Sequence, residues 1–354
     1  MDQDVSICHV NLAKGFRGGE RQTQILIQTL AEKGIRQILV ARTDSPLHQH
    51  LAGTEKLTHI GVRKPYMRGI PDVAKLKPSI VHAHDAKAAQ WSLLNWWRHK
   101  TPYLITRRVP NPLSRNFFTR AVYRNAEMVV VLSNAIKYSV RGLLPDVDIQ
   151  IIPSMYASFP VDTGKVDSLR RRYAGKFVVG HIGALVDHNK GQSIVIEAAR
   201  RLSERRPELH YVFLGTGKDE QRLKKIASDR SDIEFIGFVS DVGNWIALFD
   251  LFVFPSYHEG LGSTLLDVMQ GGCPIIASAT DGILDVIEHE VNGLLMPPGN
   301  PEKLAAAIDR LYSDPELRER FVQENRQRLV LYSPKYIVGR YYELYQSILD
   351  GVTG

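Results

Sequence analysis

The chain has 354 residues, of which 44% are hydrophobic and 23% charged, with a formal net charge of +7. This length exceeds one ordinary hydrophobic core and predicts two domains, and the composition excludes a disordered chain. No apolar run approaches the roughly 18 residues that span a bilayer, and acids stand near the N-terminus where a signal peptide carries lysines. We therefore expect a cytoplasmic location. The two cysteines, Cys8 and Cys273, predict no disulfide framework.

The positive charge is concentrated in the first half of the chain. Residues 1–160 contain 22 Lys and Arg against 11 Asp and Glu, whereas residues 161–354 contain 23 against 27. Within the first half, residues 86–126 hold eight basic residues, no acid and several aromatic residues. Such a surface attracts anions, for example an anionic membrane or a phosphorylated ligand. Alternatively, the tryptophans form a buried helix face and the arginines are simply solvated.

Short runs rich in Val and Ile alternate with segments of helical period along the whole chain, which predicts an α/β fold of two doubly wound, Rossmann-like lobes. The predicted strands are residues 6–12, 36–41, 79–84, 102–106, 128–133 and 149–153 in the first lobe, and 177–183, 210–215, 233–237, 251–256, 274–278 and 292–297 in the second. The predicted domains are 1–160 and 161–332, with a helix over 333–354 that packs back on the first lobe. Two such lobes form a cleft at the carboxyl ends of their strands.

After the first strand, "KGFRGGERQTQILIQTL" predicts a helix that opens at Gly18 and Gly19. A dinucleotide-binding fold needs G-x-G-x-x-G at this place, with an acid about twenty residues later. That pattern is absent here, which disfavours a nicotinamide-dependent dehydrogenase.

Further along, "SIVHAHDAK" places His82 and His84 on one face of a strand with Asp85 at its edge. No further metal ligand is evident, so we expect no metal and favour His84 beside the cleft. In "LITRRVPNP", Arg107 and Arg108 cannot serve as bases, but they can bind a phosphate. The "DVD" of residues 146–148 is interpreted as a solvated turn.

In the second lobe, "YHEGLGSTLLDVMQGGCP" predicts a helix that begins near Leu261 or Gly262. The free amides and dipole of a helix start bind phosphate, and glycines allow close approach to the backbone. Glu259 and Asp267 bracket this site and would repel phosphate unless they accept hydrogen bonds from neighbouring hydroxyls. A nucleotide sugar has hydroxyls on both sides of its diphosphate. Alternatively, Glu259 caps the helix and Asp267 faces solvent.

The segment "FPSYHEGLGSTLLDVMQGGCPIIAS", with "NGLLMPPGNPEKLAAAI" after it, resembles the donor-binding region of retaining GT-B glycosyltransferases of family four. The resemblance implies that Glu259 contacts the transferred sugar and that Asp267, where the family has Glu, binds the ribose. It also implies that the loop and helix start bind the diphosphate, through Gly260, Gly262, Ser263 and Thr264.

Other segments extend the resemblance. In "HIGALVDHNKGQS", Gly183 and Lys190 match the family's glycine and its diphosphate-binding lysine, but Ala184 stands at the place of the family's arginine. Arg17 or Arg108 is the candidate replacement. Gly215 and Gly217 resemble the next glycine turn, a pattern that more often only shapes a turn. Gly18 and Gly19 resemble the glycine pair opposite the donor.

The resemblance implies a retaining, metal-independent hexosyltransferase without a cofactor, which moves a sugar from a nucleotide-diphosphate sugar to an acceptor hydroxyl. The candidate catalytic residues are Glu259, Lys190, Arg108 and His84. The basic aromatic stretch favours a lipid-linked or phosphorylated acceptor such as lipopolysaccharide core, with possible contact to the inner face of the cytoplasmic membrane and no nucleic-acid partner. One alternative is a nucleotide-sugar epimerase of the same fold. The other is a nucleic-acid-binding module, but this alternative leaves the anion site of the second lobe unexplained.

Overall fold

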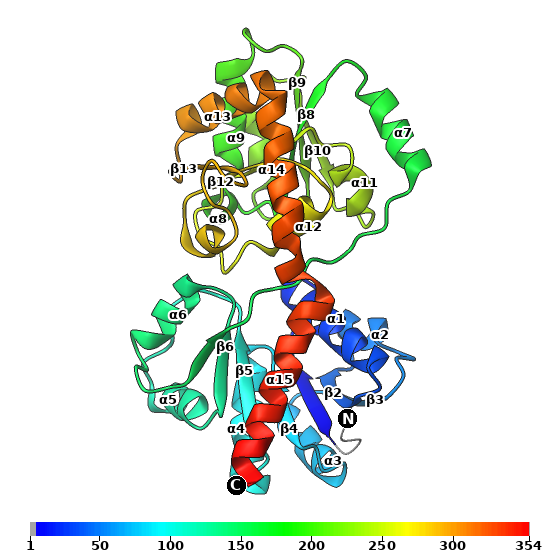
Figure 1. The fold of residues 1–354 in the computed structure, drawn as a ribbon, viewed down its shortest axis with the longest axis vertical. Helices are drawn as coiled ribbons and strands as arrows, with labels where there is room; N and C mark the ends of the chain where they lie inside the picture. The colour runs from blue at the N-terminus through cyan, green and yellow to red at the C-terminus, as the bar shows by residue number, and fades with distance from the viewer. Residues whose placement is uncertain (1–4, 354) are drawn as a thin grey trace. The chain divides into compact units, whose positions relative to one another are not determined.

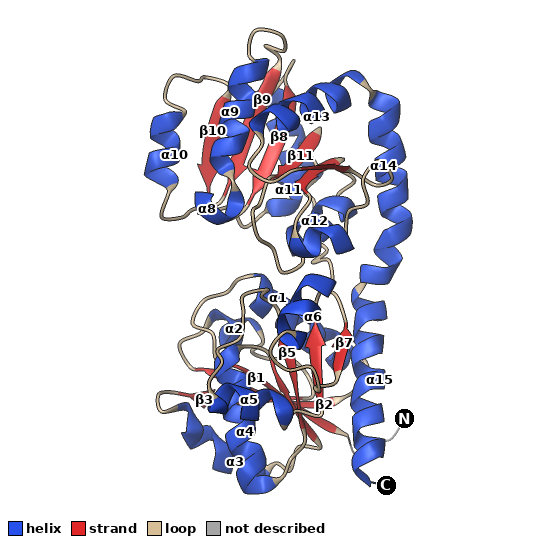
Figure 2. Cartoon of the chain, turned by 90° about the vertical axis from the view of Figure 1, so that its left-hand side faces the viewer, coloured by secondary structure: helices blue, strands red, loops and turns tan. Residues whose placement is uncertain are grey.

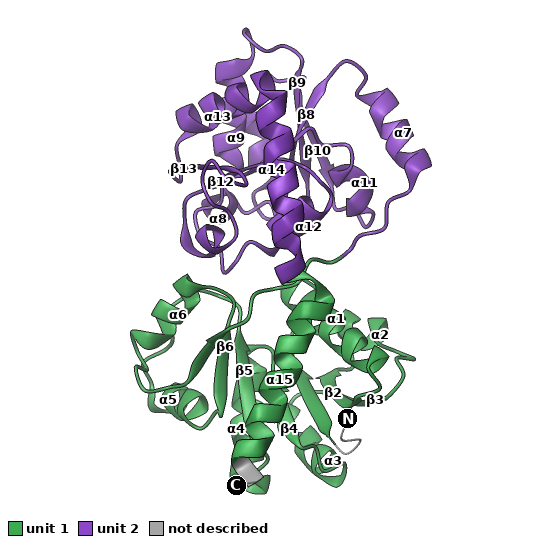
Figure 3. Cartoon of the chain, in the orientation of Figure 1, with its two compact units in different colours: residues 1–157, 332–354 green, residues 158–331 purple. Residues whose placement is uncertain are grey.

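The computed structural model describes residues 5–353, which divide into two compact units (Figure 3). Unit 1 contains residues 1–157 and 332–354, and unit 2 contains residues 158–331. Each unit has one parallel sheet with helices on both of its faces (Figure 2). The predicted α/β class with two Rossmann-like sheets is confirmed.

The sheet of unit 1 has the strand order β3-β2-β1-β4-β5-β6-β7, and every neighbouring pair is parallel. Its strands are β1 (Ser6–Asn11), β2 (Arg36–Arg42), β3 (Leu57–Val62), β4 (Ile80–Ala83), β5 (Tyr103–Arg107), β6 (Met128–Val131) and β7 (Ile149–Ile151). Its helices are α1 (Gly18–Glu32), α2 (Pro46–His50), η1 (Tyr66–Gly69), α3 (Ile70–Lys75), α4 (Ala86–His99), α5 (Phe117–Arg124), α6 (Asn134–Arg141) and α15 (Pro334–Thr353).

Strand alternation decides which side chains of unit 1 meet the last helix. Ile7, Ile80 and Leu104 point to the same face of the sheet and pack in one cluster with Ile337 and Tyr341 of α15. Figures 1 and 2 show α15 lying along this face, on the side opposite α4 and α5. The chain therefore leaves unit 1 after β7 and returns to it with its last helix.

Unit 2 repeats the architecture with the strand order β10-β9-β8-β11-β12-β13, again parallel throughout. Its strands are β8 (Phe177–Ile182), β9 (Leu209–Leu214), β10 (Ile233–Gly237), β11 (Leu251–Phe254), β12 (Ile275–Ser278) and β13 (Leu294–Met296). Its helices are α7 (Thr163–Arg172), α8 (Asp187–Lys190), α9 (Gln192–Leu202), α10 (Glu220–Ile226), α11 (Val242–Ile246), α12 (Ser263–Gln270), η2 (Asp281–Asp285), α13 (Pro301–Ser313), α14 (Pro315–Arg328) and η3 (Leu329–Tyr332).

The core of unit 2 lies between one face of its sheet and the helices α9, α13 and α14. Val253 and Phe213 from the strands meet Ala198 of α9, Ile308 of α13 and Phe321 of α14 in one buried cluster. Polar side chains such as His181 and Ser278 are also buried in the strands, and further polar groups of unit 2 lie on the loops that follow the strands.

Two elements differ from the sequence-based expectation. β3 is missing from the predicted strands, because Thr58, His59 and Gly61 interrupt its apolar residues. Between the predicted strands 149–153 and 177–183, where no element was predicted, lies the helix α7, which begins at an Asp162 cap and packs against α11. No helix among residues 5–353 combines the length and apolar character that crossing a membrane requires.

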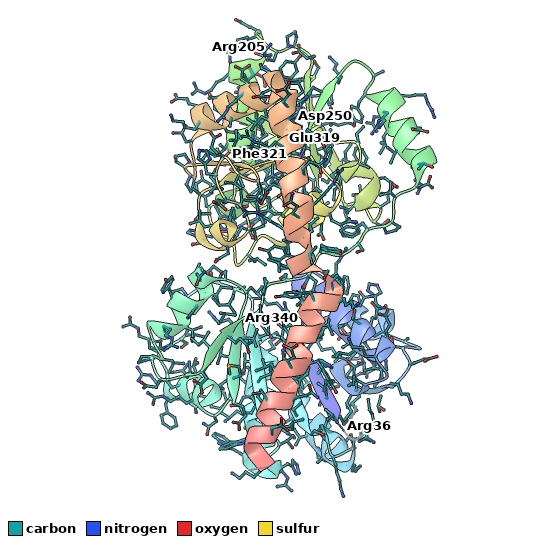
Figure 4. All side chains as sticks on the ribbon, viewed as in Figure 1. Arg36, Arg205, Asp250, Glu319, Phe321 and Arg340 are labelled. Carbon is teal, nitrogen blue, oxygen red and sulfur yellow. The ribbon has the colours of Figure 1, made fainter. Side chains whose placement is uncertain are left out.

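Phe321 provides a test of the unit 2 core. Phe321→Ala removes a fully buried ring, and we expect it to lower the stability of unit 2 by roughly 3–5 kcal/mol. Glu319→Ala on the exposed side of the same helix is the matched control and should change stability little (Figure 4). Scanning calorimetry of both variants measures the difference, and equal melting of the two would contradict the packing described here.

Candidate functional site

The polar residues of unit 2 gather on loops that follow the carboxyl ends of β8 and β11. The loop after β8 leads through α8 to Lys190, and the loop after β11 carries Ser256 and Glu259. The two loops are tied together, since the backbone N–H of Tyr257 donates to the carbonyl of Asn189 at 2.8 Å. Parallel strands place both loops at the same edge of the sheet, which is the usual ligand edge of such folds.

Lys190 and Glu259 form an ion pair between these loops. The ammonium lies 5.1 Å from the centre of the Phe254 ring, and Ser256 Oγ donates to Glu259 Oε1 at 2.9 Å. Both Lys190 and Ser256 contact Oε1. Glu259 Oε2 therefore has no protein partner among the described residues and can accept a hydrogen bond from a ligand hydroxyl.

Asp281 holds the loop that carries Glu259. Its Oδ2 accepts hydrogen bonds from the backbone N–H of Glu259 and from His258 Nδ1, both at 3.2 Å. Asp281 itself adopts a φ of +42°, a region that most residues avoid. The Glu259 carbonyl accepts in turn from Gly282 N–H at 3.2 Å, so the carboxylate projects from a loop fixed on both sides.

The helix α12 begins directly after this loop. Its N-cap is Gly262, with φ +79°, and no side chain caps its first amides. Ser263 and Thr264 form the start of the helix, where free N–H groups and the dipole favour an anion. Asp267 lies one turn further along α12 and is half-buried.

Three glycines allow the loops of unit 2 to pack closely. A Cβ on Gly215 would lie 2.1 Å from the carbonyl oxygen of Gly183, and one on Gly217 would lie 2.3 Å from that of Leu185. A Cβ on Gly191 would lie 2.3 Å from Pro255 O. Such distances exclude any side chain, so these glycines are explained by loop packing. Ligand contact by Gly215 and Gly217 stays a prediction.

Ala184 is exposed on the loop after β8 and offers no cation. On the same loop, Asp187 Oδ2 binds Arg222 of α10 at 2.6 Å, and Asp187 Oδ1 accepts from Ser193 N–H at 2.7 Å. Arg222 is thus committed to a structural ion pair. Arg17 and Arg108, the predicted replacements, both belong to unit 1.

Unit 1 contains a cavity of about 360 Å³ at the carboxyl ends of β4 and β5. Four of the predicted residues line it, namely Arg17, Gly19, His84 and Arg108. Its lining also includes Glu20, Asp85, Ala86, Ile105, Thr106, Arg107, Val109 and Tyr123. Gly18 is the first residue of α1, beside the cavity residues Arg17 and Gly19.

Three arginines line the cavity, and two of them, Arg107 and Arg108, differ in their contacts. Arg107 donates to Tyr123 Oη at 3.2 Å and to the carbonyl of Asn111, so its guanidinium is held by its own unit. Arg108 packs over Gly19, where a Cβ would lie 3.3 Å from Arg108 Cδ. In the described part of the chain, Arg108 has no ion pair, and its Nε is buried without a hydrogen-bond partner. The Arg108 guanidinium, unlike that of Arg107, is therefore held by no hydrogen bond or ion pair among the described residues that would keep it from a ligand.

Three histidines lie together at the same edge. The strand register pairs His9 with His82, and the His82 and His84 ring centres are 3.9 Å apart. Asp85, beside them, caps α4 by accepting from Lys87 N–H at 2.8 Å. Burial lowers the pKa of all three imidazoles, that of His9 to about 3, so they are neutral at physiological pH.

These histidines are the residues of unit 1 that fit a metal best, since their ring nitrogens lie within 4.8 Å of one another. However, His9 bonds His84 Nε2 at 3.0 Å and Gln37 at 3.1 Å, and His82 bonds Tyr345 and Thr106 at 2.7 Å each. Only His84 Nδ1 lacks a protein partner among the described residues. Apart from this atom, the ring nitrogens of the cluster are thus already hydrogen-bonded within unit 1.

Sequence reasoning missed His9, Gln37, Thr106 and Tyr345 in unit 1, and Ser256 and Asp281 in unit 2. His9 had a usable signal, because a polar residue inside an apolar strand, next to the strand of His82, suggests a polar contact. Tyr345 had none, because its partner His82 lies 263 positions away in the sequence.

Only some side chains of the basic aromatic stretch, residues 86–126, are exposed. Trp91 is 2% exposed and belongs to the core, as the alternative reading expected. Trp97, Phe117 and Phe118 are exposed by 48%, 84% and 37%. Trp97 meets Phe118 edge to face at 6.4 Å. We call Trp97, Phe117, Phe118, Arg120 and Arg124 the α4–α5 surface.

Comparison with protein families gives two matches that together span most of the chain. A family described as "Glycosyl transferases group 1" matches residues 169–328, and one described as "Glycosyltransferase Family 4" matches residues 16–155. The first covers the donor-type loops of unit 2, and the second covers the cavity of unit 1.

Full-length relatives agree with these matches. The lipopolysaccharide core biosynthesis glycosyltransferase LpsE of Rhizobium meliloti is 26% identical over 97% of this chain and 99% of its own length. The crystal structure of Anabaena Alr3699/HepE in complex with UDP and glucose has a TM-score of 0.84 at 18% identity, over 97% of this chain and 100% of that one. A glycosyltransferase from Rickettsia africae has a TM-score of 0.85 at 20% identity, over 98% of both chains.

The solved structures confirm the predicted fold, and the family matches confirm the predicted enzyme class. The epimerase alternative finds no support in these comparisons. The chain therefore belongs to the family 4 type of glycosyltransferases with the GT-B fold.

Proposed function

We propose that the enzyme transfers a sugar, with retention of configuration, from a nucleotide-diphosphate sugar to a hydroxyl of a lipid-linked or phosphorylated envelope glycan such as lipopolysaccharide core. The observation that carries the donor assignment is the Lys190–Glu259 pair beside the uncapped start of α12. It is supported by HepE, a structural neighbour solved with UDP-glucose. The acceptor assignment is supported by LpsE and LpsD, relatives named for lipopolysaccharide core biosynthesis.

The donor fits unit 2 by charge and hydrogen bonding. The diphosphate would lie at the amides of residues 262–264, with Lys190 as its cation. The free Oε2 of Glu259 would accept a hydroxyl of the transferred sugar, and Asp267 would bind the ribose hydroxyls. In the structure without ligand Glu259 holds Lys190, so the ammonium is already positioned when the phosphate arrives.

The chemical step separates a diphosphate from an oxocarbenium-like centre. Catalysis then requires positive charge and N–H groups aimed at the leaving oxygens, which Lys190 and the α12 amides would supply. The carboxylate beside Glu259, that of Asp281, is engaged by the Glu259 backbone N–H and by His258, so we do not assign it as a nucleophile. We therefore favour a front-face path, in which the leaving phosphate accepts the proton of the attacking hydroxyl and no metal takes part.

The acceptor would bind to unit 1, in the cavity that contains Arg108. The guanidinium of Arg108, whose Nε has no hydrogen-bond partner among the described residues, would attract an anionic group of the acceptor, and the neutral histidines add no charge of their own. The α4–α5 surface would contact the anionic headgroups of the membrane that carries a lipid-linked acceptor.

Donor binding tests this proposal directly. We expect a UDP-, GDP-, ADP- or dTDP-linked sugar at 100 times its Kd to stabilise the protein by about 2.7 kcal/mol. Thermal-shift measurements with the four nucleotide sugars give the result, and UDP-glucose is the first choice because HepE binds it. A shift with NAD and none with the nucleotide sugars would overturn the proposal.

Lys190 and Glu259 should differ in what they contribute. Lys190→Met removes the phosphate cation, so we expect weaker donor binding and at least a roughly hundredfold slower release of nucleotide diphosphate. Glu259→Gln keeps the shape and should slow turnover with a smaller change in donor Kd. Calorimetric titration and a nucleotide-release assay separate the two effects. Lys224→Ala, which breaks the exposed Lys224–Glu220 pair of the same unit, is the matched control and should change neither quantity.

The α4–α5 surface predicts salt-sensitive binding to anionic membranes. Phe117→Ser with Trp97→Ser should reduce sedimentation with phosphatidylglycerol vesicles several-fold, because both exposed rings are lost. Phe238→Ser, which removes a ring in unit 2 that is 78% exposed, is the control and should bind as the parent does. Equal binding of the parent to neutral and anionic vesicles would refute the electrostatic contribution.

A further inference from the structure

A chain of three buried side chains runs from the interior of the unit 1 sheet to its cavity. Gln37 of β2 contacts His9 of β1, with 3.1 Å between Gln37 Oε1 and His9 Nε2. His9 Nδ1 lies 3.0 Å from Nε2 of His84, which follows β4 and lines the cavity. His84 is only 4% exposed, and the other two side chains have no exposed surface.

The backbone fixes which way the chain of hydrogen bonds runs. Gln37 Nε2 donates to the carbonyl oxygen of Ile27 at 2.9 Å, and a carbonyl can only accept. The amide orientation of Gln37 is therefore set, and its Oε1 faces His9. Because this oxygen also can only accept, the proton of His9 must be on Nε2.

Because the imidazoles are neutral, the direction of the hydrogen bonds is also fixed from His9 to His84 at the cavity. Burial lowers the pKa of His9 to about 3, and burial, with the charges of neighbouring histidines and Arg108, keeps the pKa of His84 well below its usual range. Each ring then carries one N–H. Since His9 uses its proton at Nε2, its Nδ1 accepts from His84 Nε2–H. His84 Nδ1 is left as an unprotonated lone pair.

Complementary atoms are thus left unpaired on residues that line the cavity. Arg107 Nε also lacks a partner among the described residues, but the terminal nitrogens of Arg107 are held by Tyr123 and Asn111. His84 Nδ1 is an acceptor without a donor, and Arg108 Nε–H is a donor without an acceptor; both are buried and unpartnered among the described residues. Leaving such groups unsatisfied costs stability, so a ligand that satisfies both gains affinity. A hydroxyl group can donate to one atom and accept from the other.

We propose that His84 and Arg108 form a hydroxyl-recognition subsite for an anionic polyol, in which the hydroxyl donates to His84 Nδ1 and the guanidinium of Arg108 binds the adjoining anionic group. Gln37 and His9 are positioning residues that keep His84 Nδ1 unprotonated. The assignment of this polyol as the glycosyl acceptor rests on the proposed function. The subsite selects a free hydroxyl, because a deoxy or O-methyl analogue has no proton to donate.

The proton positions can be tested on the unmodified protein. Two-bond nitrogen–proton correlation spectra of the nitrogen-15-labelled full chain distinguish protonated from unprotonated ring nitrogens. We expect His9 and His84 each to show a protonated Nε2 and an unprotonated Nδ1 at neutral pH. A protonated Nδ1 on His84, or bound zinc retained by the three histidines after purification, would overturn the proposal.

Ligand selectivity is tested with two small probes of equal charge, glycerol 3-phosphate and propyl phosphate. We expect glycerol 3-phosphate to bind roughly tenfold more tightly in NMR titrations, since only it carries hydroxyls beside the phosphate. His84→Gln keeps a donor for His9 but has no atom at the Nδ1 position, so it should abolish this preference. His84→Asn places an amide oxygen near the Nδ1 position and should retain part of it.

Gln37→Leu distinguishes a positioning role of Gln37 from a purely structural one. Gln37 does not line the cavity, yet its loss should remove the single tautomer of His84 and weaken the preference for glycerol 3-phosphate. Equal binding of the two probes by the parent protein would refute the subsite. That result is independent of the donor, because nucleotide-sugar binding to unit 2 is measured separately and its failure would leave this subsite in place.

Discussion

Parallel pairing is the constraint on which the rest of this structure depends. In both sheets every neighbouring strand pair is parallel, so the chain must leave each strand at the same edge and cross back through a helix. The apolar faces of the sheets are covered by those helices, which leaves the strand ends as the place for polar loops. Lys190 and Glu259 meet for this reason in unit 2, and His84 and Arg108 line one cavity for the same reason in unit 1.

The two units stabilise their partly or fully buried polar side chains in different ways. Unit 2 keeps a charged pair at its loop edge, with Lys190 and Glu259 each partly open to solvent and Ser256 adding a hydrogen bond. Unit 1 buries its histidines so deeply that they stay neutral, and it satisfies them with neutral partners such as Tyr345. A charged pair suits a ligand with phosphates, whereas neutral imidazoles suit hydroxyl groups. This contrast matches a donor on unit 2 and an acceptor on unit 1.

Local sequence patterns were sufficient for the fold class and for the strands that are buried on both faces. They were insufficient for β3, because Thr58, His59 and Gly61 interrupt its apolar residues, whereas the edge strands β7 and β10 have more continuous apolar runs. In the candidate site, the spacing of glycines and carboxylates predicted that Glu259 lies on a loop and that a helix begins directly after this loop. The start of α12 confirms the predicted helix. The partners that hold these groups come from distant segments. Asp281 lies 22 residues after Glu259, and no local pattern encodes that contact.

Ala184 stands at the place where the family resemblance implies an arginine. The positive charge that would balance a bound diphosphate must therefore come from other groups. Unit 2 holds Arg222 in an ion pair with Asp187, and Ala184 offers no cation of its own. A diphosphate at α12 would then be neutralised by Lys190 and backbone amides alone, which balances only part of its charge. Unit 1, in contrast, carries excess positive charge and an arginine without a carboxylate partner in the described part of the chain. The excess positive charge of the chain therefore belongs to unit 1, whereas a diphosphate bound as proposed on unit 2 would meet Lys190 and the N–H groups of α12.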